Sequence, residues 1–388
     1  MIAEGYHKMK TLVLGGDGFC GWPTSLHLAS QGHDVLIVDN LARRGIADRI
    51  SSPSLTPIAS IEKRIAAAQS IGSISFEFCD IATDCLRLKE ILAHFQPDTV
   101  VHFAEQRSAP YSMLGDSERR FTVDNNINGT NNLMSSLVEL GQRPHVVHLG
   151  TMGVYGYNDD FGEIPEGYLD VTVKQTQKDV SICYPGNPGS IYHMTKVLDH
   201  TIMQFYAKNW GFRITDLHQG IVWGTDTELT RSHPQLINRF DYDGEYGTVL
   251  NRLLSQSQVG HPLTVYGTGG QSRAFIHIQD TARCIHLACG NAPDEGSLPQ
   301  VFNQIAEVHT VRVLAQMISD KTGVEIGFQD NPRKEAAENQ LRVSNQGLRS
   351  LGFEPITLDD HLMKEIESTV VAFKDRIDHS VIDSKARW

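Results

Sequence analysis

Short apolar runs alternate with amphipathic stretches along the first part of the chain. Six runs rich in leucine and β-branched residues lie at 11–14, 34–38, 74–78, 99–103, 145–149 and 214–217. Stretches with the apolar spacing of helices separate them, at 24–30, 86–94, 125–140 and from about residue 190. Apolar strands that alternate with helices are typical of a parallel sheet covered on both faces. The pattern predicts the α/β class, with a doubly wound parallel sheet.

The alternation becomes less regular after about residue 225. Short strands are expected at 262–266, 274–278 and 324–327, and helices at 280–289, 311–321 and 358–373. No repeat or low-complexity linker divides the chain. We predict a domain over residues 9–225 and a smaller mixed α/β lobe over 226–388, with a soft boundary that segments can cross. The connection over 41–73 is long for such a fold, and we expect it to form a lid or an oligomer contact.

Composition excludes several classes of protein. The 388 residues are 40% hydrophobic and 21% charged, which is typical of a globular protein and not of a disordered or fibrous one. The net charge of -12 argues against a general nucleic-acid binder. No run approaches the roughly 18 apolar residues of a membrane-spanning helix, and residues 1–10 lack the apolar core of a secretion signal. We expect a cytoplasmic protein whose partner is a small molecule.

The six cysteines are scattered through the chain, without a CxxC pair or the spacing of zinc ligands. We interpret them as reduced core residues and predict no metal site. Met9 stands two residues before the first predicted strand. Either Met1 or Met9 could therefore be the native start of the protein.

A glycine-rich turn follows the first predicted strand. Gly15, Gly18 and Gly21 form a GxxGxxG pattern before the predicted helix. Glycines there permit a tight turn and a close approach of the backbone to a pyrophosphate, which the helix N-terminus attracts. The second strand ends at Asp39, whose carboxylate can accept hydrogen bonds from both hydroxyls of an adenine ribose. These residues predict a Rossmann-type dinucleotide site, and Asp39 favours NAD over NADP because a carboxylate repels a 2′-phosphate.

Loops at the carboxyl ends of parallel strands carry ligands, so we expect further cofactor contacts there. Arg43 and Arg44 follow the second strand and are either cofactor contacts or solvated loop charges; Arg43 is retained as a candidate. The other expected cofactor contacts are Phe19, Cys20, Asn40, Asp80, Ile81, Phe103, Glu105, Asn125 and Gln219.

Three residues predict hydride-transfer chemistry. Tyr192 and Lys196 stand four residues apart on a predicted helix, so their side chains share one face. This spacing alone is common, but after a dinucleotide motif it indicates an acid/base pair, because removal of hydride from an alcohol carbon requires a group that takes the hydroxyl proton. Lys196 and a positive nicotinamide would favour the tyrosinate and bring it towards neutral pH. Thr151, at the end of the fifth strand, would hold the substrate hydroxyl, and Tyr192 and Lys196 would also contact the cofactor.

These residues, in this order, resemble the short-chain dehydrogenase/reductase family, and in particular its extended branch, which modifies nucleotide sugars. Longer motifs resemble the UDP-sulfoquinovose synthase family within that branch, at residues 54–60, 105–113, 149–153, 192–193, 260–267, 331–333 and 373–376. The resemblance spans both lobes. It implies NAD-assisted conversion of UDP-glucose and sulfite into UDP-sulfoquinovose, the head-group donor of sulfolipid, by a homodimer that takes sulfite directly or from a delivering protein.

The resemblance also implies a sequence of steps. Tyr192 would take the proton of the sugar 4-hydroxyl while hydride passes to NAD. The resulting 4-keto intermediate would acidify the C5 hydrogen, so that the 6-hydroxyl is eliminated and sulfite adds. Thr151 and Met152 would stand beside the reacting sugar. His193 is a candidate proton shuttle, although a single histidine is more often a structural residue.

Four polar residues are candidates for the substrate. Arg273 and Arg333 would hold the UDP phosphates, since a guanidinium matches phosphate oxygens. The alternative for both is a salt bridge within the second lobe. Gln106 and Arg107 would contact sulfite or the sugar.

Two departures from related patterns keep other hypotheses open. Met152-Gly153 stands where related sugar 4,6-dehydratases carry Asp-Glu after the threonine. Val154 stands where the UDP-sulfoquinovose synthase pattern continues with Glu. The second hypothesis is therefore a related UDP-sugar 4-epimerase or dehydratase that does not use sulfite. The third is a non-catalytic regulator that binds NAD or a nucleotide sugar.

Overall fold

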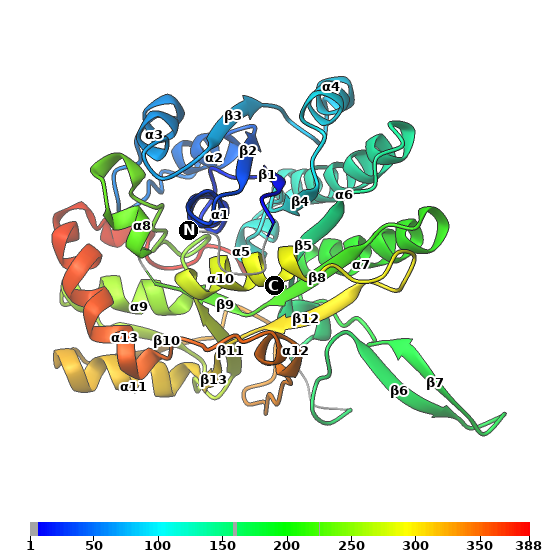
Figure 1. Cartoon of the computed structure of the whole chain (residues 1–388). Helices are drawn as coiled ribbons and strands as arrows, with labels where there is room; N and C mark the ends of the chain where they lie inside the picture. Colours follow the sequence, from blue (N-terminus) through cyan, green and yellow to red (C-terminus); the bar gives the residue numbers. More distant parts are fainter. Residues whose placement is uncertain (1–6, 158–160, 225) are drawn as a thin grey trace.

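A seven-stranded parallel sheet forms the centre of the N-terminal lobe in the computed structural model, which describes residues 7–157, 161–224 and 226–388 (Figure 1). The strand order is β12-β8-β5-β4-β1-β2-β3, with every neighbouring pair parallel. The strands are β1 (Lys10–Leu14), β2 (Asp34–Asp39), β3 (Ile74–Phe78), β4 (Thr99–His102), β5 (His145–Thr151), β8 (Ile214–Gln219) and β12 (Gln300–Gln304). The order reverses between β1 and β4, and ligands of such sheets bind at the carboxyl ends beside this point. The predicted doubly wound sheet is confirmed.

Helices cover both faces of this sheet (Figure 1). Val13 of β1 lies in one core with Trp22 and Leu26, whereas its neighbours Leu12 and Leu14 lie in the other core, because successive side chains of a strand point to opposite faces. The first face carries α1 (Gly21–Ser30) and α10 (Ile278–Gly290), and the second carries α4 (Cys85–Phe95), α6 (Asp116–Glu139) and α7 (Ile191–Trp210).

The helix α6 begins at Asp116, not at the predicted Asn125. Its first turn contains Asp116 and Glu118, and acidic side chains stabilise the positive end of the helix dipole. The apolar spacing that predicts a helix is weak in this first part, so the sequence pattern missed it.

The second lobe contains short mixed sheets around its own apolar core. Its strands are β9 (Ile221–Trp223), β10 (Leu263–Tyr266), β11 (Ser272–His277), β13 (Glu307–Thr310) and β14 (Ile326–Gln329). Its helices are α9 (Val249–Gln258), α11 (Val311–Thr322) and α13 (Leu358–Glu365), whereas α8 (Glu228–Arg231) packs on α1 and α12 (Gln346–Ser350) packs on β12 of the first lobe. Single helical turns follow at Ile366–Val370, Lys374–Arg376 and His379–Val381, and another lies at Pro234–Leu236.

The chain crosses back to the first lobe after residue 225. The helix α10 packs on α1, and β12 pairs with β8 at the edge of the main sheet. The sequence pattern did not predict β12, because three of its five residues are Gln300, Asn303 and Gln304. The two lobes are therefore not consecutive halves of the chain.

The long connection after β2 contains α2 (Ala42–Arg49) and α3 (Ile61–Ala68). Arg44 and Arg64 both bind the Asp17 carboxylate in the glycine-rich turn, at 2.7 and 2.5 Å. Thr56 donates a hydrogen bond of 2.6 Å to the backbone oxygen of Asn238 in the second lobe. The connection thus joins the glycine-rich turn to the second lobe, which gives a structural reason for its length.

A hairpin of β6 (Tyr168–Val173) and β7 (Lys178–Cys183) projects from the body of the molecule (Figure 1). The sequence pattern did not predict it. All six cysteines are free, as expected, but Cys183 of this hairpin is exposed and Cys85 is half-buried. The interpretation of all six as core residues is wrong for these two. Within the described parts of the chain, we find no helix with the length and apolar character that would let it cross a membrane.

Candidate active site

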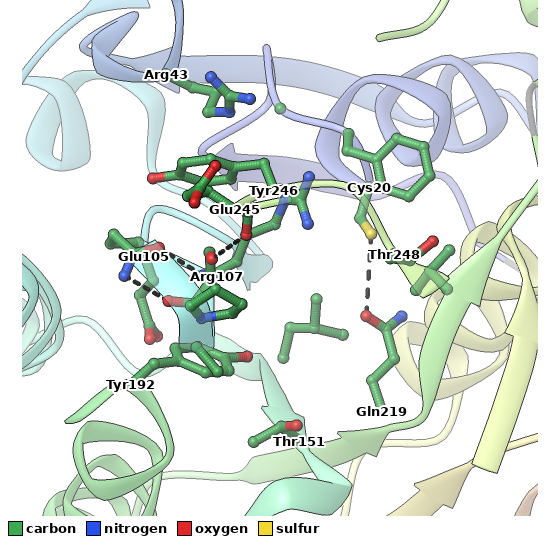
Figure 2. Close-up of a pocket in the computed structure, with 18 of the residues that line it drawn as sticks. Cys20, Arg43, Glu105, Arg107, Thr151, Tyr192, Gln219, Glu245, Tyr246 and Thr248 are labelled. Atoms are coloured by element: carbon green, nitrogen blue, oxygen red, sulfur yellow. Dashed lines mark hydrogen bonds between the residues drawn. The ribbon is translucent and has the colours of Figure 1, made fainter. Parts of the chain in front are cut away.

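A cavity of about 360 Å³ lies at the carboxyl ends of the main strands and reaches into the second lobe (Figure 2). Among the residues that the structure describes, every predicted site residue except Met152 lines this cavity. The cavity gathers Gly15, Gly18, Phe19, Cys20, Gly21, Asp39, Asn40, Arg43, Asp80, Ile81, Phe103, Glu105, Gln106, Arg107, Asn125, Thr151, Tyr192, His193, Lys196, Gln219, Arg273 and Arg333.

The glycine-rich turn has the close packing that a dinucleotide cradle requires. Gly15 has a φ of +79°, and a Cβ there would lie 2.6 Å from the backbone carbon of Phe103. A Cβ on Gly21 would lie 2.2 Å from the Gly15 oxygen. Each position therefore excludes a side chain, so backbone alone faces the space where a pyrophosphate binds in such folds. This cradle, together with the carboxylate at the end of β2, fits NAD.

Asp39 lies half-buried at the end of β2 and lines the cavity. Its two oxygens accept hydrogen bonds from the backbone of Asp17 and Leu41, at 2.9 and 2.7 Å, and each keeps capacity for a ribose hydroxyl. Burial, followed by the nearby Asp17 carboxylate, raises the pKa of Asp39 to about 6. Arg44 is bound to Asp17 and is not a solvated loop charge, so its guanidinium is already paired. The arrangement agrees with the preference for NAD over NADP.

Tyr192 lies in the first turn of α7, where Ser190 caps the helix by accepting a hydrogen bond from the His193 backbone. Thr151 ends β5 and lies close to the phenol of Tyr192 (Figure 2). Burial raises the pKa of Tyr192 to about 12, although Lys196 lowers it. Among the effects of the protein itself, burial raises the pKa of Tyr192 by more than Lys196 lowers it. A pKa closer to neutral pH, as expected from the sequence, therefore also requires the positive charge of the nicotinamide.

Lys196 is almost fully buried and paired with the protein itself. Its ammonium lies 2.6 Å from Glu105 and donates a hydrogen bond of 2.6 Å to the Leu149 oxygen. Glu105 also contacts His148, at 3.0 Å. Although burial opposes it, Glu105 raises the pKa of Lys196 and keeps the ammonium charged. Glu105 lines the predicted cofactor cavity, but its carboxylate is engaged by Lys196 and His148.

His193 packs against the turn that follows β5. A Cβ on Gly153 would lie 2.2 Å from His193 Cδ2 and 2.4 Å from Nε2, so only glycine leaves room for this ring. Burial, followed by Arg333 and Arg273, lowers the pKa of His193 to about 3. The imidazole is therefore neutral at physiological pH, and it is a weak base in these surroundings.

Met152 and Val154 belong to the single helical turn Met152–Tyr155 and lie in a buried apolar cluster with Tyr155 and Ile164. Neither is among the described residues that line the cavity. The predicted contact of Met152 with the sugar therefore has no support from the position of its side chain. The departure from the UDP-sulfoquinovose synthase pattern at Val154 therefore lies outside the described lining of the cavity.

Arginines line the end of the cavity in the second lobe. Arg273 pairs with Glu335 at 2.5 Å and lies over the ring of Tyr157, 4.5 Å from its centroid. Arg333 lies over the Trp388 ring. Arg273 thus forms the salt bridge that was its alternative role, while both guanidinium groups remain in the lining. Arg252 of α9 is a third arginine here, which the sequence motifs did not single out.

A second group of arginines surrounds Asp241. Arg43, Arg107 and Arg239 contact its carboxylate at 3.0, 2.7 and 3.2 Å. Arg43 also stacks on Tyr246, with 3.8 Å between the guanidinium carbon and the ring centroid (Figure 2). Arg43 is therefore not a solvated loop charge. Sequence analysis missed Tyr246 and Asp241, which lie in the segment after residue 225 where the alternation of strands and helices becomes less regular.

Two glutamines at the cavity are held by hydrogen bonds within the protein. The side chain of Gln106 bonds to Ser108 and to Thr122, so its amide fixes the loop after β4. This engagement weakens the expectation that Gln106 contacts sulfite or the sugar. Gln219 accepts a weak hydrogen bond from the Cys20 thiol, at 3.9 Å (Figure 2).

Residues 11–303 match the model of the NAD dependent epimerase/dehydratase family. The chain belongs to this family. It is 43% identical to the chloroplastic UDP-sulfoquinovose synthase of Spinacia oleracea, over 98% of this chain and 79% of the relative. It is 37% identical to the UDP-sulfoquinovose synthase of Sulfolobus acidocaldarius, over 98% of each. The resemblance that the motifs indicated is confirmed.

One solved structure has the same fold as this chain. The UDP-glucose 4-epimerase of Thermotoga maritima, solved with UDP-glucose, superposes with a TM-score of 0.69. The match covers 95% of this chain and 99% of the epimerase, at 22% identity. At this identity the likeness shows the fold alone, and it confirms the predicted α/β architecture with a smaller second lobe.

Proposed function

We propose that this protein is an NAD-dependent enzyme that converts UDP-glucose and sulfite into UDP-sulfoquinovose. One observation carries the proposal: the Thr151, Tyr192 and Lys196 side chains converge on the same cavity as the dinucleotide cradle. The two UDP-sulfoquinovose synthases to which the chain is similar support the choice of substrate.

The first step is deprotonation of the sugar 4-hydroxyl by Tyr192, while Thr151 orients that hydroxyl. NAD bound in the cradle would supply the acceptor, and later the donor, of hydride. A phenol with a raised pKa is a strong base once ionised, so the nearby Lys196 charge has to stabilise its anion. Glu105 holds Lys196 in place for this role.

His193 is our candidate for the elimination. Its ring lies beside the turn that follows Thr151. Arg333 and Arg273 help to lower its pKa, so it would accept the acidified C5 proton of a 4-keto sugar once the bound diphosphate has neutralised these two arginines. The proton can then be returned to the leaving 6-hydroxyl, which departs as water. Sulfite adds to C6 while C5 takes a proton from bisulfite or solvent, and hydride returns to C4 while Tyr192 returns the proton to O4. These steps complete a cycle with no second redox substrate.

Arg252, Arg273 and Arg333 are proposed to bind the diphosphate of the nucleotide sugar, because they bring three guanidinium groups to one end of the cavity. The sugar then extends towards Tyr192. Arg107 is proposed to contact the sulfite or the sugar, although one of its nitrogens is bound to Asp241.

The test is incubation of the purified protein with UDP-glucose, NAD and sulfite, followed by mass spectrometry of the nucleotide sugars. We expect a sulfonated UDP-sugar that requires sulfite. Formation of UDP-galactose or of a deoxysugar at equal rate with and without sulfite would instead identify an epimerase or dehydratase. Unchanged UDP-glucose from a protein that binds NAD and UDP-glucose would favour a regulator.

We further propose a homodimer that forms through α6 and α7, located in the cytoplasm. Leu198 and Phe205 of α7 expose 42% and 54% of their surface, which is a large exposure for apolar side chains that lie two turns apart on the same face of the helix. Light scattering of the wild type and of a Phe205→Glu variant tests the oligomer, since a buried charge should dissociate it.

A further inference from the structure

Two of the three arginines at the second-lobe end of the cavity are held from within that lobe. Arg273 pairs with Glu335 at 2.5 Å and donates a hydrogen bond of 2.9 Å to the backbone oxygen of Ser272. Arg252 extends from α9 over the ring of Tyr266, with 5.0 Å between the guanidinium carbon and the ring centroid. These contacts define where both guanidinium groups lie.

Arg333 has a different kind of support. Both carboxylate oxygens of Glu335 are engaged elsewhere, one by Arg273 and the other by the Asn331 amide at 3.1 Å. In the described parts of the chain, no ion pair or hydrogen bond holds the Arg333 guanidinium. This group lies over the ring of Trp388, with 5.1 Å between its carbon and the ring centroid. The indole face is therefore its main contact.

The three guanidinium groups repel one another. Burial, followed by the charges of Arg273 and Arg252, lowers the pKa of Arg333, although Glu335 raises it. The Nε of Arg252 is a buried atom that has no hydrogen-bond acceptor among the described residues. Within the same part of the chain, the Glu335 carboxylate alone is paired with this group of three. The surplus of positive charge suits a diphosphate.

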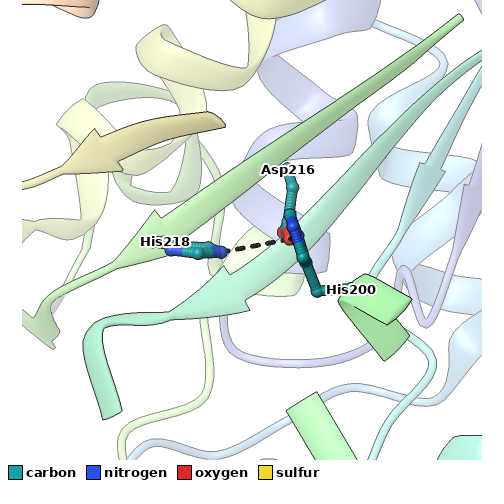
Figure 3. A group of neighbouring side chains, drawn as sticks. All are labelled: His200, Asp216 and His218. Carbon is teal, nitrogen blue, oxygen red and sulfur yellow. Dashed lines mark hydrogen bonds and ion pairs between the residues drawn. The ribbon is translucent and has the colours of Figure 1, made fainter. Parts of the chain in front are cut away.

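Another buried group of charges, outside the cavity lining, is balanced within the protein. Asp216 contacts His200 and His218 through one carboxylate oxygen, at 2.7 and 3.1 Å (Figure 3). His148 contacts the other oxygen at 2.8 Å. Both oxygens of this carboxylate therefore have partners in the chain, whereas the arginine end of the cavity has more donors than acceptors.

The backbone of Trp388 is bound on both sides of Arg333. Its N–H donates a hydrogen bond of 3.0 Å to the Pro332 oxygen, and its backbone oxygen accepts one of 2.6 Å from the Lys334 N–H. The residues before and after the arginine are thus tied to the residue whose ring the guanidinium covers. This arrangement keeps the ring and the arginine side by side.

The indole nitrogen of Trp388 contacts the start of the helix α7. Nε1 donates a hydrogen bond of 2.7 Å to the backbone oxygen of Gly189. The next residue, Ser190, caps this helix, and Tyr192 lies in its first turn. The ring is therefore fixed both by its backbone and by its nitrogen, so that it presents a constant face to Arg333.

We propose that Trp388 is a positioning residue that holds the Arg333 guanidinium in place for the diphosphate of the nucleotide sugar. The face of an indole attracts a guanidinium, and the attraction is larger where water is excluded. It opposes the repulsion from Arg252 and Arg273. Trp388 is not among the described residues that line the cavity, so it acts through Arg333. The inference rests on the proposed function, because the diphosphate belongs to the proposed substrate.

The experiment measures by calorimetry how tightly the NAD-saturated protein binds UDP. Trp388→Ala removes the ring and keeps the backbone bonds, and we expect it to weaken UDP binding by about tenfold. Arg333→Ala should weaken it by about tenfold or more, because hydrogen bonds between charged groups are lost. In the double variant, loss of Trp388 should add less than about twofold, since the ring then has no guanidinium to hold.

Two further variants serve as controls. Trp388→Phe keeps an aromatic face without the N–H, and its affinity for UDP should stay within about threefold of the wild type. Phe328→Ala removes an aromatic side chain of the same lobe that is 57% exposed, and it should leave UDP binding unchanged. The affinity for NAD should be the same in all variants, because the dinucleotide cradle lies in the first lobe.

Several results would overturn the positioning role of Trp388. These are wild-type UDP affinity in Trp388→Ala, losses that multiply fully in the double variant, and a Trp388→Phe protein as weak as Trp388→Ala. A parallel loss of NAD affinity would show that the ring only maintains the fold, and would overturn it as well. If Arg333→Ala binds UDP like the wild type, it is the proposed diphosphate site itself that fails.

Discussion

The Lys196 ammonium and the Glu105 carboxylate lie 2.6 Å apart, at 4% and 2% exposure, near Tyr192, the base that we propose. The Lys196 charge lowers the pKa of Tyr192, and the Glu105 charge raises it. The loop after β4 and the helix α7 therefore set the basicity of the phenol together. This pairing leads directly to the first prediction.

Glu105→Gln should shift the pH profile of sugar oxidation to lower pH. The variant removes a charge that raises the pKa of Tyr192 and keeps Lys196, which lowers it. Stopped-flow absorbance of NADH in the first turnover measures this shift. Loss of one partner of a buried ion pair should also reduce the free energy of unfolding by about 3 kcal/mol. The matched control is Glu77→Gln, in a half-exposed pair with Arg87, which should change stability by less than about 1 kcal/mol.

Tyr192→Phe should lower kcat by about 10²–10⁴-fold, because it removes the group that takes the sugar hydroxyl proton. NAD binding, measured by calorimetry, should persist. Tyr206→Phe is the control on the same helix, since that hydroxyl binds Asn131 and lies outside the cavity lining. Its kcat should match the wild type. An active Tyr192→Phe protein would contradict the assignment of the base.

Gly153→Ala should displace the His193 ring, because the new Cβ would lie 2.2 Å from it. We expect sulfonation to fall more than the first oxidation step, because the atoms that the new Cβ meets belong to His193 and not to Tyr192 or Thr151. Product analysis and single-turnover NADH formation separate the two steps. Gly45→Ala in α2 is the control, with nothing within 4 Å of its Cβ, and should stabilise the protein by about 0.5–1 kcal/mol.

Asp39→Asn should weaken NAD binding by about tenfold or more and reduce the discrimination against NADP. The carboxylate provides charged acceptors for the ribose hydroxyls, and hydrogen bonds to charged groups contribute about 1.5–3 kcal/mol each. Titration of wild type and variant with both dinucleotides measures the change. Equal affinity of the wild type for NAD and NADP would contradict the role of Asp39.

The free energy of unfolding should have a component that is lost as the pH falls from about 6.5 to about 4. The rings of His27 and His33 both pack against the ring of His286. Their centroids lie 5.6 and 5.4 Å from the His286 centroid, respectively. Burial lowers the pKa of His27 and His286 to about 4 and that of His33 as well. The unfolded chain binds more protons in this range, so these groups stabilise the fold above pH 6.5 and lose that effect below it.

Denaturant unfolding at several pH values tests this component. His286→Gln should make the dependence on pH shallower between 6.5 and 4. His94→Gln, at an exposed position, should leave it unchanged. A wild-type slope that persists in His286→Gln would contradict the contribution of this cluster.

The sequence by itself determined the parallel sheet, the glycine-rich turn, the carboxylate at Asp39 and the Tyr192–Lys196 pair. These features depend on local patterns: the burial of a strand on both faces, the room that glycine leaves, and the spacing of a helix. A reader of the chain can recognise them without knowing which segments meet.

Only the tertiary structure decided which side chains become partners. Glu105 and Lys196 come from different strand–helix units, and Asp241 meets Arg43 and Arg107 across the two lobes. The polar strand β12 enters the main sheet because β8 offers it an edge, not because its own residues have strong strand preferences. Such contacts depend on the packing of distant segments, whose ion pairs and hydrogen bonds leave no spacing pattern in the sequence.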